Sequence, residues 1–283
     1  LPRLAGGEKK PDPDFNPDNA GIGKTPEFKL ATAFPRVPDT MAVYKAKPPV
    51  VTIDSVRELG RKFGFECEPA VAEDGIWIAD KVDGKDRHLI VHSNSGGINY
   101  YGPCDLHPPD PPTLPGDDEA KRIATDFLSK RGLLPTGLEA MEVICGGSSG
   151  YGCAHLLVRF TPHGIDGVPV TGPGAKFGVR IGDKGEIISA MVAFRREIEP
   201  YKAAAIISPA EAYEQFKAGK SSYPVSASGG KITIQEISLA YWIEAMPEEQ
   251  QYIAPVYIFE GNHLTADDST SQFTSWVEAL KGE

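Results

Sequence analysis

Apolar side chains alternate with polar ones along several segments in the second half of the chain. Leu156, Val158 and Phe160 follow this pattern, and it recurs between residues 177 and 181 and between residues 188 and 194. A side-chain period of two is typical of β-strands that bury one face. The polar residues between the apolar ones predict an antiparallel sheet whose second face meets water.

Three other segments place their apolar residues at helical spacing: 52–63, 117–131 and 208–219. The third begins Ser208-Pro209-Ala210-Glu211, a capping box with proline at the first helical position. Strands are predicted after each helix, so a unit of one helix followed by several strands repeats. This repetition predicts an α+β fold in which each module packs one helix on a curved antiparallel sheet.

The predicted modules cover residues 49–113, 114–206 and 207–283, and the third is either separate from the second or continuous with it. Prolines between residues 103 and 115 indicate a linker between the first two modules. Residues 1–48 have a different character. Nine of the 25 prolines lie in the first 50 residues, and this stretch has no helical period. We therefore expect an extended N-terminal arm with no core of its own.

One segment of the arm has the pattern of a strand. Between Glu27 and Phe34, the apolar residues Phe28, Leu30 and Phe34 fall on one side, and no proline interrupts them. A single strand is not stable alone and must join a sheet. That sheet belongs either to the same chain or to a neighbouring copy. We expect the neighbouring copy, with Phe28, Leu30 and Phe34 as interface residues.

The net charge of −10 argues against nucleic acid as a partner, and no apolar run is long enough to predict a transmembrane segment. The sequence begins at Leu1 rather than Met, which favours a mature secreted or extracytoplasmic protein. Four cysteines are present. The hairpin context predicts a Cys145–Cys153 disulfide, and Cys67 and Cys104 then pair by elimination. The alternative is four buried thiols in a cytosolic protein.

Candidate sites for chemistry are few. Oxygen-bearing side chains at Asp12, Asp14, Asn16 and Asp18 alternate as in calcium loops, so calcium is the one cofactor we consider. Pro17 stands where an EF-hand needs glycine, which excludes that motif. The alternative is an ordinary solvated segment.

Two further patterns resemble sites of known kinds. His88 and His92 are four residues apart, but on a strand this spacing separates them by about 13 Å, so we expect solvated histidines. The segment 146–150 has the pattern G-x-S-x-G around Ser148. A strand rather than a helix is expected after it, which favours a hairpin over a catalytic nucleophile.

The turn Ile165-Asp166-Gly167-Val168-Pro169-Val170 and the hairpin Asp183-Lys184-Gly185-Glu186-Ile187-Ile188 resemble the PepSY-like domains, which are related to the propeptides of thermolysin-type proteases. The segment 239–261 resembles extracytoplasmic regulatory proteins of the YycH and YycI kind. The resemblance covers residues 115–262 well and 48–102 weakly. It implies an extracytoplasmic protein with a binding or inhibitory role and no catalytic residues.

These observations predict a secreted structural protein that is not an enzyme. We expect it to self-associate, head to tail, into extracellular filaments by exchange of its N-terminal arm, with itself as the main partner. The alternative is a monomeric PepSY-like module that binds another cell-surface protein and regulates a protease or a sensor kinase.

Overall fold

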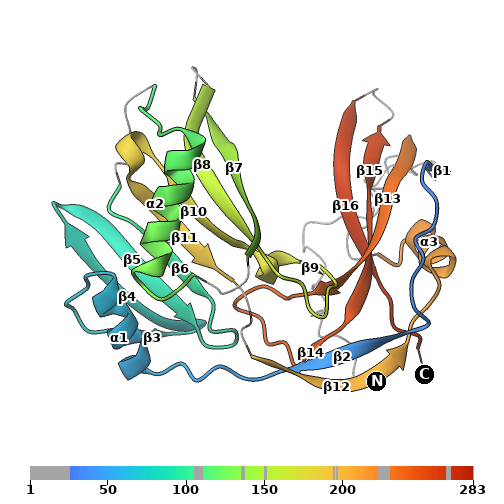
Figure 1. Cartoon of the computed structure of the whole chain (residues 1–283), viewed down its shortest axis with the longest axis horizontal. Coiled ribbons are helices and arrows are strands. Elements are labelled where there is room, and N and C mark those ends of the chain that lie inside the picture. Colours follow the sequence, from blue (N-terminus) through green and yellow to red (C-terminus); the bar gives the residue numbers. More distant parts are fainter. Residues whose placement is uncertain are drawn as a thin grey trace, which may run out of the picture. The chain divides into compact units, whose positions relative to one another are not determined.

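The computed structural model describes residues 26–104, 111–134, 138–149, 152–193, 195, 197–221, 230–265 and 269–282. The described residues form two compact units (Figure 1). Unit 1 combines 26–45, 199–242 and 252–282, and unit 2 combines 46–198 and 243–251. No helix among the described residues is long and apolar enough to span a membrane.

The predicted fold class is wrong. The described residues are mostly β, with 48% strand and 17% helix, and their strands gather into large sheets rather than into repeated modules of one helix each.

One antiparallel sheet of eight strands forms the frame of unit 2. Its strands are β3 (Ala70–Ala72), β4 (Gly75–Val82), β5 (Lys85–His92), β6 (Ile98–Tyr101), β7 (Leu138–Ser149), β8 (Gly152–Pro162), β10 (Phe177–Ile181) and β11 (Ile187–Val192). The order across the sheet is β3-β4-β5-β6-β11-β10-β8-β7. Between β8 and β10 the chain forms the short strand β9 (Val170–Thr171) and the 3-10 turn η1 (Pro173–Ala175), and the turn η2 (Asp183–Gly185) joins β10 to β11.

Two helices cover the same face of this sheet: α1 (Ile53–Lys62) and α2 (Asp117–Ser129). The sequence predicted both. Thr52 and Ser55 form a capping box at the start of α1, and three acidic residues occupy the first turn of α2, where they complement the helix dipole.

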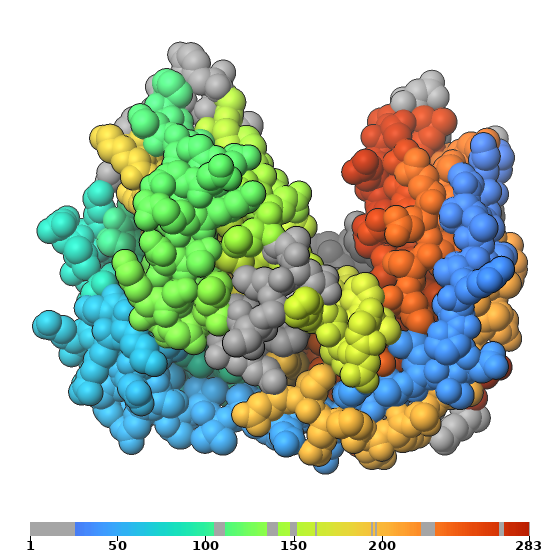
Figure 2. Space-filling view, viewed as in Figure 1, coloured from blue at the N-terminus to red at the C-terminus, as the bar shows by residue number. Residues whose placement is uncertain are grey.

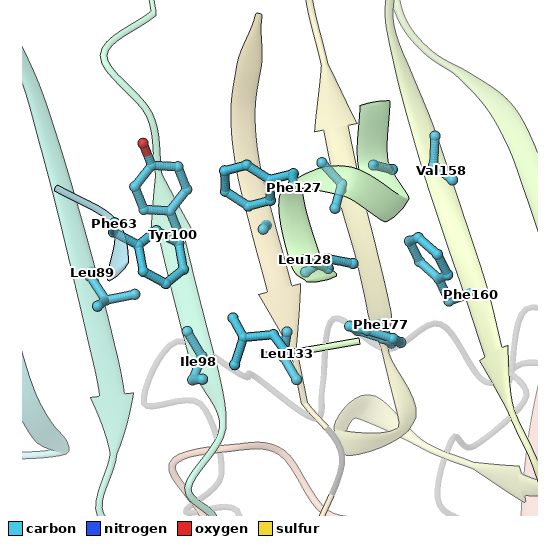
Figure 3. Packing of buried hydrophobic residues seen from close by; sticks show 14 of the residues in the cluster. Phe63, Leu89, Ile98, Tyr100, Phe127, Leu128, Leu133, Val158, Phe160 and Phe177 are labelled. Atoms are coloured by element: carbon cyan, nitrogen blue, oxygen red, sulfur yellow. The ribbon is translucent and has the colours of Figure 1, made fainter. Parts of the chain in front are cut away.

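The two helices share one hydrophobic core rather than two (Figure 3). The rings of Phe63 after α1, Tyr100 on β6 and Phe127 on α2 meet there, with centroids 4.7 to 5.8 Å apart. Burying an aromatic side chain of this size contributes about 2–3 kcal/mol.

The pairing of β6 with β11 explains why the modular fold is wrong. Ile98 lies opposite Val192, and Tyr101 lies opposite Ser189. This contact joins the strands that follow α1 to the strands that follow α2 in a single sheet. Alternation within each strand predicts which face is buried, but it carries no information about which strand edges meet.

Unit 1 contains a sheet with the path β1-β13-β15-β16. These strands are β1 (Glu27–Leu30), β13 (Lys231–Trp242), β15 (Pro255–Leu264) and β16 (Thr270–Glu278), and α3 (Pro209–Lys217) packs on one face. The predicted capping box of α3 is present, because Ser208 and Glu211 bond reciprocally. A smaller sheet has the order β12-β2-β14, with β2 (Thr40–Ala46), β12 (Ile198–Ala205) and β14 (Tyr252–Ile253).

Candidate functional site

The strongest candidate site in unit 2 is a groove on the face of the eight-stranded sheet that carries no helix. The alternation of β8 and β10 creates it, because Val158, Phe160, Val179 and Ile181 point into the core and their neighbours point outward. The groove has a volume of about 530 Å³, within the range of ligand-binding clefts. Its floor is lined by Leu157, Arg159, Gly178, Arg180, Ser189 and Met191. The remaining lining residues are 170–172 and 175–177.

Positive charge gathers in this groove although the whole chain carries −10. Arg159, Lys176 and Arg180 all line it. Arg159 lies 3.4 Å from Glu142, but both side chains are more than half exposed, so this ion pair is weak. Among the described residues, Arg180 and Lys176 form no ion pair. Two cations are therefore available to a ligand.

The pKa of His155 reflects the positive charge near the groove. It lies on β8, two residues before Leu157, and burial together with the positive charge of Arg180 lowers the pKa of its imidazole. A neutral imidazole adds no positive charge to this end of the strand. The electrostatic character of the groove therefore comes from its arginines and its lysine.

Gly178 leaves the floor of the groove without a side chain at its position. It lies opposite Arg159 on β8 and opposite Met191 on β11. A Cβ atom at this position would lie 2.9 Å from the carbonyl oxygen of Val158, closer than side chains are found to pack. The glycine thus leaves a trough between the two longer side chains, where an extended ligand can approach the backbone.

This combination favours binding over bond-breaking chemistry. Arginine guanidinium groups bind carboxylates and phosphates through paired hydrogen bonds. Leu157 and Met191 offer apolar contact beside them. An extended anionic ligand with some apolar surface fits these groups.

The predicted arm strand is present as β1, but it ends at Leu30 rather than Phe34. It pairs in parallel with β13 of the same chain, with Phe28 opposite Ile232 and Leu30 opposite Ile234. Phe28 and Leu30 are half-buried, whereas Phe34 is 41% exposed. Figure 2 shows this blue segment on the outer surface of unit 1. The strand thus has a sheet to join within one chain, and an interface role for these residues stays a prediction.

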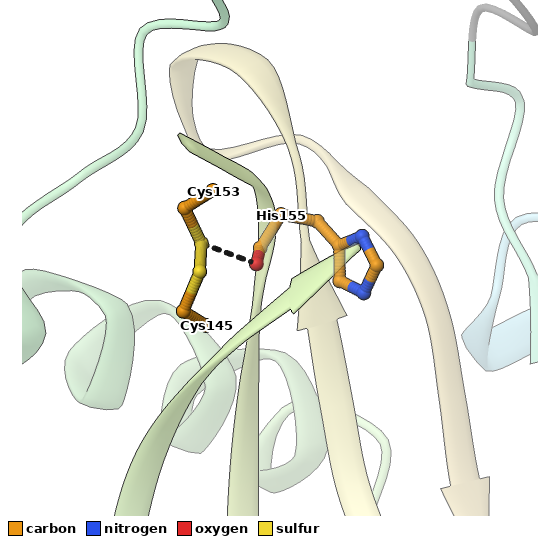
Figure 4. Close-up of a disulfide and its surroundings, with 3 residues drawn as sticks. All are labelled: Cys145, Cys153 and His155. Atoms are coloured by element: carbon orange, nitrogen blue, oxygen red, sulfur yellow. Dashed lines mark hydrogen bonds between the residues drawn. A yellow bond between two sulfur atoms is a disulfide. The ribbon is translucent and has the colours of Figure 1, made fainter. Parts of the chain in front are cut away.

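The cysteines form one of the two expected disulfides. Cys145 on β7 is bonded to Cys153 on β8, with 5.4 Å between their Cα atoms, and the Sγ of Cys153 lies 3.0 Å from the carbonyl oxygen of His155 (Figure 4). The hairpin context therefore predicted this bond correctly. β7 continues through Ser148 and Ser149, and β8 begins at Gly152, so the described part of the G-x-S-x-G segment, residues 146–149, belongs to a strand that pairs with β8.

The expected Cys67–Cys104 disulfide is wrong, because neither residue is disulfide-bonded. The Sγ of Cys67 contacts the carbonyl oxygen of Ala79 on β4, whereas Cys104 follows β6. Strand β5 lies between these two strands. Two strand spacings amount to about 10 Å, beyond the reach of a disulfide.

The histidines of β5 are less solvated than the sequence suggested. His88 stacks on Tyr101 at 4.5 Å, and burial lowers the pKa of its imidazole. His92 is 4% exposed, with its Nδ1 3.5 Å from Asp74 Oδ2 and its Nε2 3.2 Å from Asn99 Nδ2. The prediction of a solvated His92 is therefore wrong, because the last residues of β5 are buried.

No group of three potential metal ligands occurs among the residues that the structure describes. The calcium candidates Asp12, Asp14, Asn16 and Asp18 lie outside the described residues, so calcium binding there stays a prediction.

Sequence reasoning did not single out the residues of the groove. It predicted the wet face of the sheet, and Arg159 and Arg180 occupy polar positions of the alternating strands on that face. The feature that could have pointed to the groove is the arginine within each of these two strands, since the chain as a whole is acidic. Their proximity depends on the pairing of β8 with β10, which the pattern alone does not give.

No known protein-family model matches the chain, and no curated protein does. Among solved structures, the chain is similar to an uncharacterized protein from Eubacterium rectale ATCC 33656, whose crystal structure was determined at 1.45 Å resolution. The two share 13% sequence identity with a TM-score of 0.46, over 91% of this chain and 88% of the other. A likeness at this level adds nothing to the fold described above.

Proposed function

We propose that this protein is a secreted structural protein that self-associates by strand exchange, with β1 of one copy pairing with β13 of the next. The pairing of β1 with β13 carries the proposal, because it is short and lies at the end of the path β1-β13-β15-β16. It involves four residue pairs, whereas β13 and β15 are paired along ten. A short strand at the end of a sheet is the element most easily released and replaced by an identical strand from another chain.

The connection after β1 supports the exchange. Residues 31–39 contain no helix or strand, and they include Pro35 and Pro38. Prolines favour an extended connection, which separates β1 from its own sheet more readily than a tight turn does. Exchange preserves every contact of β1, so its free energy depends mainly on the connection and on protein concentration.

The aromatic contacts of β1 and of the connection after it contribute enough free energy to influence whether β1 pairs within its own chain or with another copy. Phe28 lies 5.9 Å from Phe216, and Phe34 lies 6.1 Å from Tyr213, measured between ring centroids. Burying such side chains in part is worth about 2–4 kcal/mol before the ordering of the segment is subtracted. Head-to-tail exchange that does not close into a ring produces filaments. The Cys145–Cys153 disulfide supports a location outside the cytosol.

Sedimentation velocity over a range of protein concentrations tests this function. The wild-type chain is expected to form oligomers whose size grows with concentration. A variant with Phe28→Ser and Phe34→Ser is expected to sediment as a folded monomer. Val71→Ser is the matched control, because Val71 is an apolar residue of unit 2 that is 71% exposed. A wild-type chain that stays monomeric at every concentration would contradict the proposal.

A second candidate function is a monomeric module that binds another extracytoplasmic protein. The pairing of β1 within its own chain favours it. Under this function the wild-type chain sediments as a monomer. The variant with Phe28→Ser and Phe34→Ser is then less stable to unfolding but also sediments as a monomer.

A further inference from the structure

The groove of unit 2 has positive charge that its own surroundings do not neutralise. Arg180 and Lys176 form no ion pair among the described residues, and Arg159 has only an exposed contact with Glu142. Some exposed arginines elsewhere on unit 2 are paired more closely. Arg122 of α2, for example, contacts Glu119 at 2.6 Å and Asp126 at 3.3 Å. Clustered unpaired cations on an acidic protein favour an anionic ligand.

The two arginines are arranged for an extended ligand. Arg159 lies opposite Gly178, and Arg180 lies two residues further along β10. Such diagonal neighbours on adjacent strands are about 7–8 Å apart. Alternate residues of an extended chain are about 6–7 Å apart, so two carboxylates separated by one residue match the spacing of these arginines.

The chain itself contains a segment with this chemistry. Residues 11–18 read Pro-Asp-Pro-Asp-Phe-Asn-Pro-Asp, with three carboxylates, an aromatic ring and three prolines. Asp12 and Asp14 are separated by one residue. Both Asp12 and Asn16 precede a proline, which disfavours helix and favours extended backbone. An extended proline-rich segment loses little conformational entropy on binding.

We propose that the groove is a binding site for an extended acidic peptide, and that its occupant is the segment 11–18 of a neighbouring copy. Asp12 and Asp14 bind Arg159 and Arg180, and Phe15 contacts the apolar side chains of Leu157 and Met191. The neighbouring copy as the source rests on the proposed self-association, since residues 11–18 precede β1. The groove then provides a second attachment for the same exchanged arm.

A peptide titration tests the site itself. A fluorescent peptide of residues 8–20 is titrated with the full chain that carries Asp12→Asn, Asp14→Asn and Asp18→Asn, so that its own segment does not compete. Fluorescence anisotropy is expected to show binding that weakens as salt rises. Arg180→Gln in the same chain is expected to weaken binding about tenfold, the loss typical of a charged hydrogen bond.

Two controls make the result specific. Arg122→Gln removes the same charge from α2, on the helix-covered face, and is expected to leave binding unchanged. A peptide with all three aspartates replaced by asparagine is expected not to bind. Absence of binding by the native peptide, or equal losses from Arg180→Gln and Arg122→Gln, would overturn the proposed site.

Sedimentation velocity then tests the source of the occupant. The triple asparagine chain and Arg180→Gln are each expected to associate about tenfold more weakly than the wild-type chain. Oligomers that form without any peptide binding would overturn the groove and leave the proposed self-association intact. A peptide that binds to a chain that is always monomeric would overturn both the neighbouring copy as source and the proposed self-association.

Discussion

The ring of Phe28 in β1 packs edge-on against the ring of Phe216 in α3, with 5.9 Å between their centroids. The two partners differ in what surrounds them. Phe216 is buried and also stacks on Phe259 and Phe273, whereas Phe28 is half-buried and lies at the end of its sheet. This contact therefore joins a buried core residue to an edge strand, and the proposed exchange would replace that strand.

The asymmetry predicts different costs for two truncations. Phe216→Ala leaves a cavity among aromatic rings and is expected to lower the free energy of unfolding by about 3–5 kcal/mol. Phe28→Ala is expected to cost about 1 kcal/mol, because its ring is only partly buried and lies on an edge strand. Urea unfolding of both variants measures the difference. Equal costs would show that β1 is an integral part of the core and would argue against its release.

The disulfide predicts a simple thiol count. Alkylation of the denatured wild-type chain without reductant is expected to modify two cysteines, Cys67 and Cys104, and with reductant four. Mass spectrometry reads both numbers. Replacing Cys145 and Cys153 by alanine is expected to lower the free energy of unfolding by about 2–3 kcal/mol, the effect of opening a short loop in the unfolded chain. Four modified cysteines without reductant would contradict the assignment.

Helices and faces of the sheet follow directly from the sequence, whereas the joining of strands does not. The cap at Ser208 and Glu211 fixes the start of α3 locally, so the pattern predicts it well. The contact between β6 and β11 joins residues about 90 positions apart and depends on the whole core. Pairing cysteines by elimination failed for the same reason, because it ignored the strand between Cys67 and Cys104.

The groove illustrates the same limit at a site. Each arginine is visible in the sequence as a polar residue on the wet face of a strand. Only the register of β8 with β10 places Arg159 and Arg180 as diagonal neighbours. Charge patterning therefore predicts that the face is polar, but the proximity of its cations requires the structure.

Tyr257 predicts a loss of stability at high pH. Its hydroxyl donates a hydrogen bond to the carbonyl oxygen of Ile207 at 2.6 Å, and burial, with a smaller effect of Glu211, raises its pKa to about 12. The unfolded phenol has a pKa near 10. Below pH ~10 both states keep the proton, so the full stabilisation is present. As pH rises from about 10 to 12, only the unfolded state loses the proton, and stability falls by about 2–3 kcal/mol.

Urea unfolding between pH 8 and 12 measures this effect when wild type is compared with Tyr257→Phe. The variant is expected to lack this component of the pH dependence, although other tyrosines still titrate. Identical pH profiles for the two proteins would contradict the assignment.

We expect Arg195 to stabilise the fold of unit 2. It is 6% exposed, and its guanidinium donates to the carbonyl oxygens of Asn94 at 2.8 Å and Glu248 at 2.6 Å. Arg195→Met removes two charged hydrogen bonds made by a buried side chain, so we expect a loss of about 2–4 kcal/mol in urea unfolding. Arg159→Met is the control, and its exposed side chain is expected to cost less than about 0.5 kcal/mol. An unchanged free energy of unfolding for Arg195→Met would show that water replaces the guanidinium at both carbonyl oxygens.

Cysteine cross-linking between β1 and β13 distinguishes exchange from intrachain pairing most directly. Lys29 lies opposite Thr233 in the register of these strands. Chains carrying Lys29→Cys are mixed with chains carrying Thr233→Cys, oxidised, and separated on a non-reducing gel, with each single variant alone as the control. Strand exchange predicts covalent dimers that form in the mixture far more than in either control. Dimers at control level in the mixture, together with a purely intrachain bond in the Lys29→Cys/Thr233→Cys double variant at every concentration, would contradict self-association through β1.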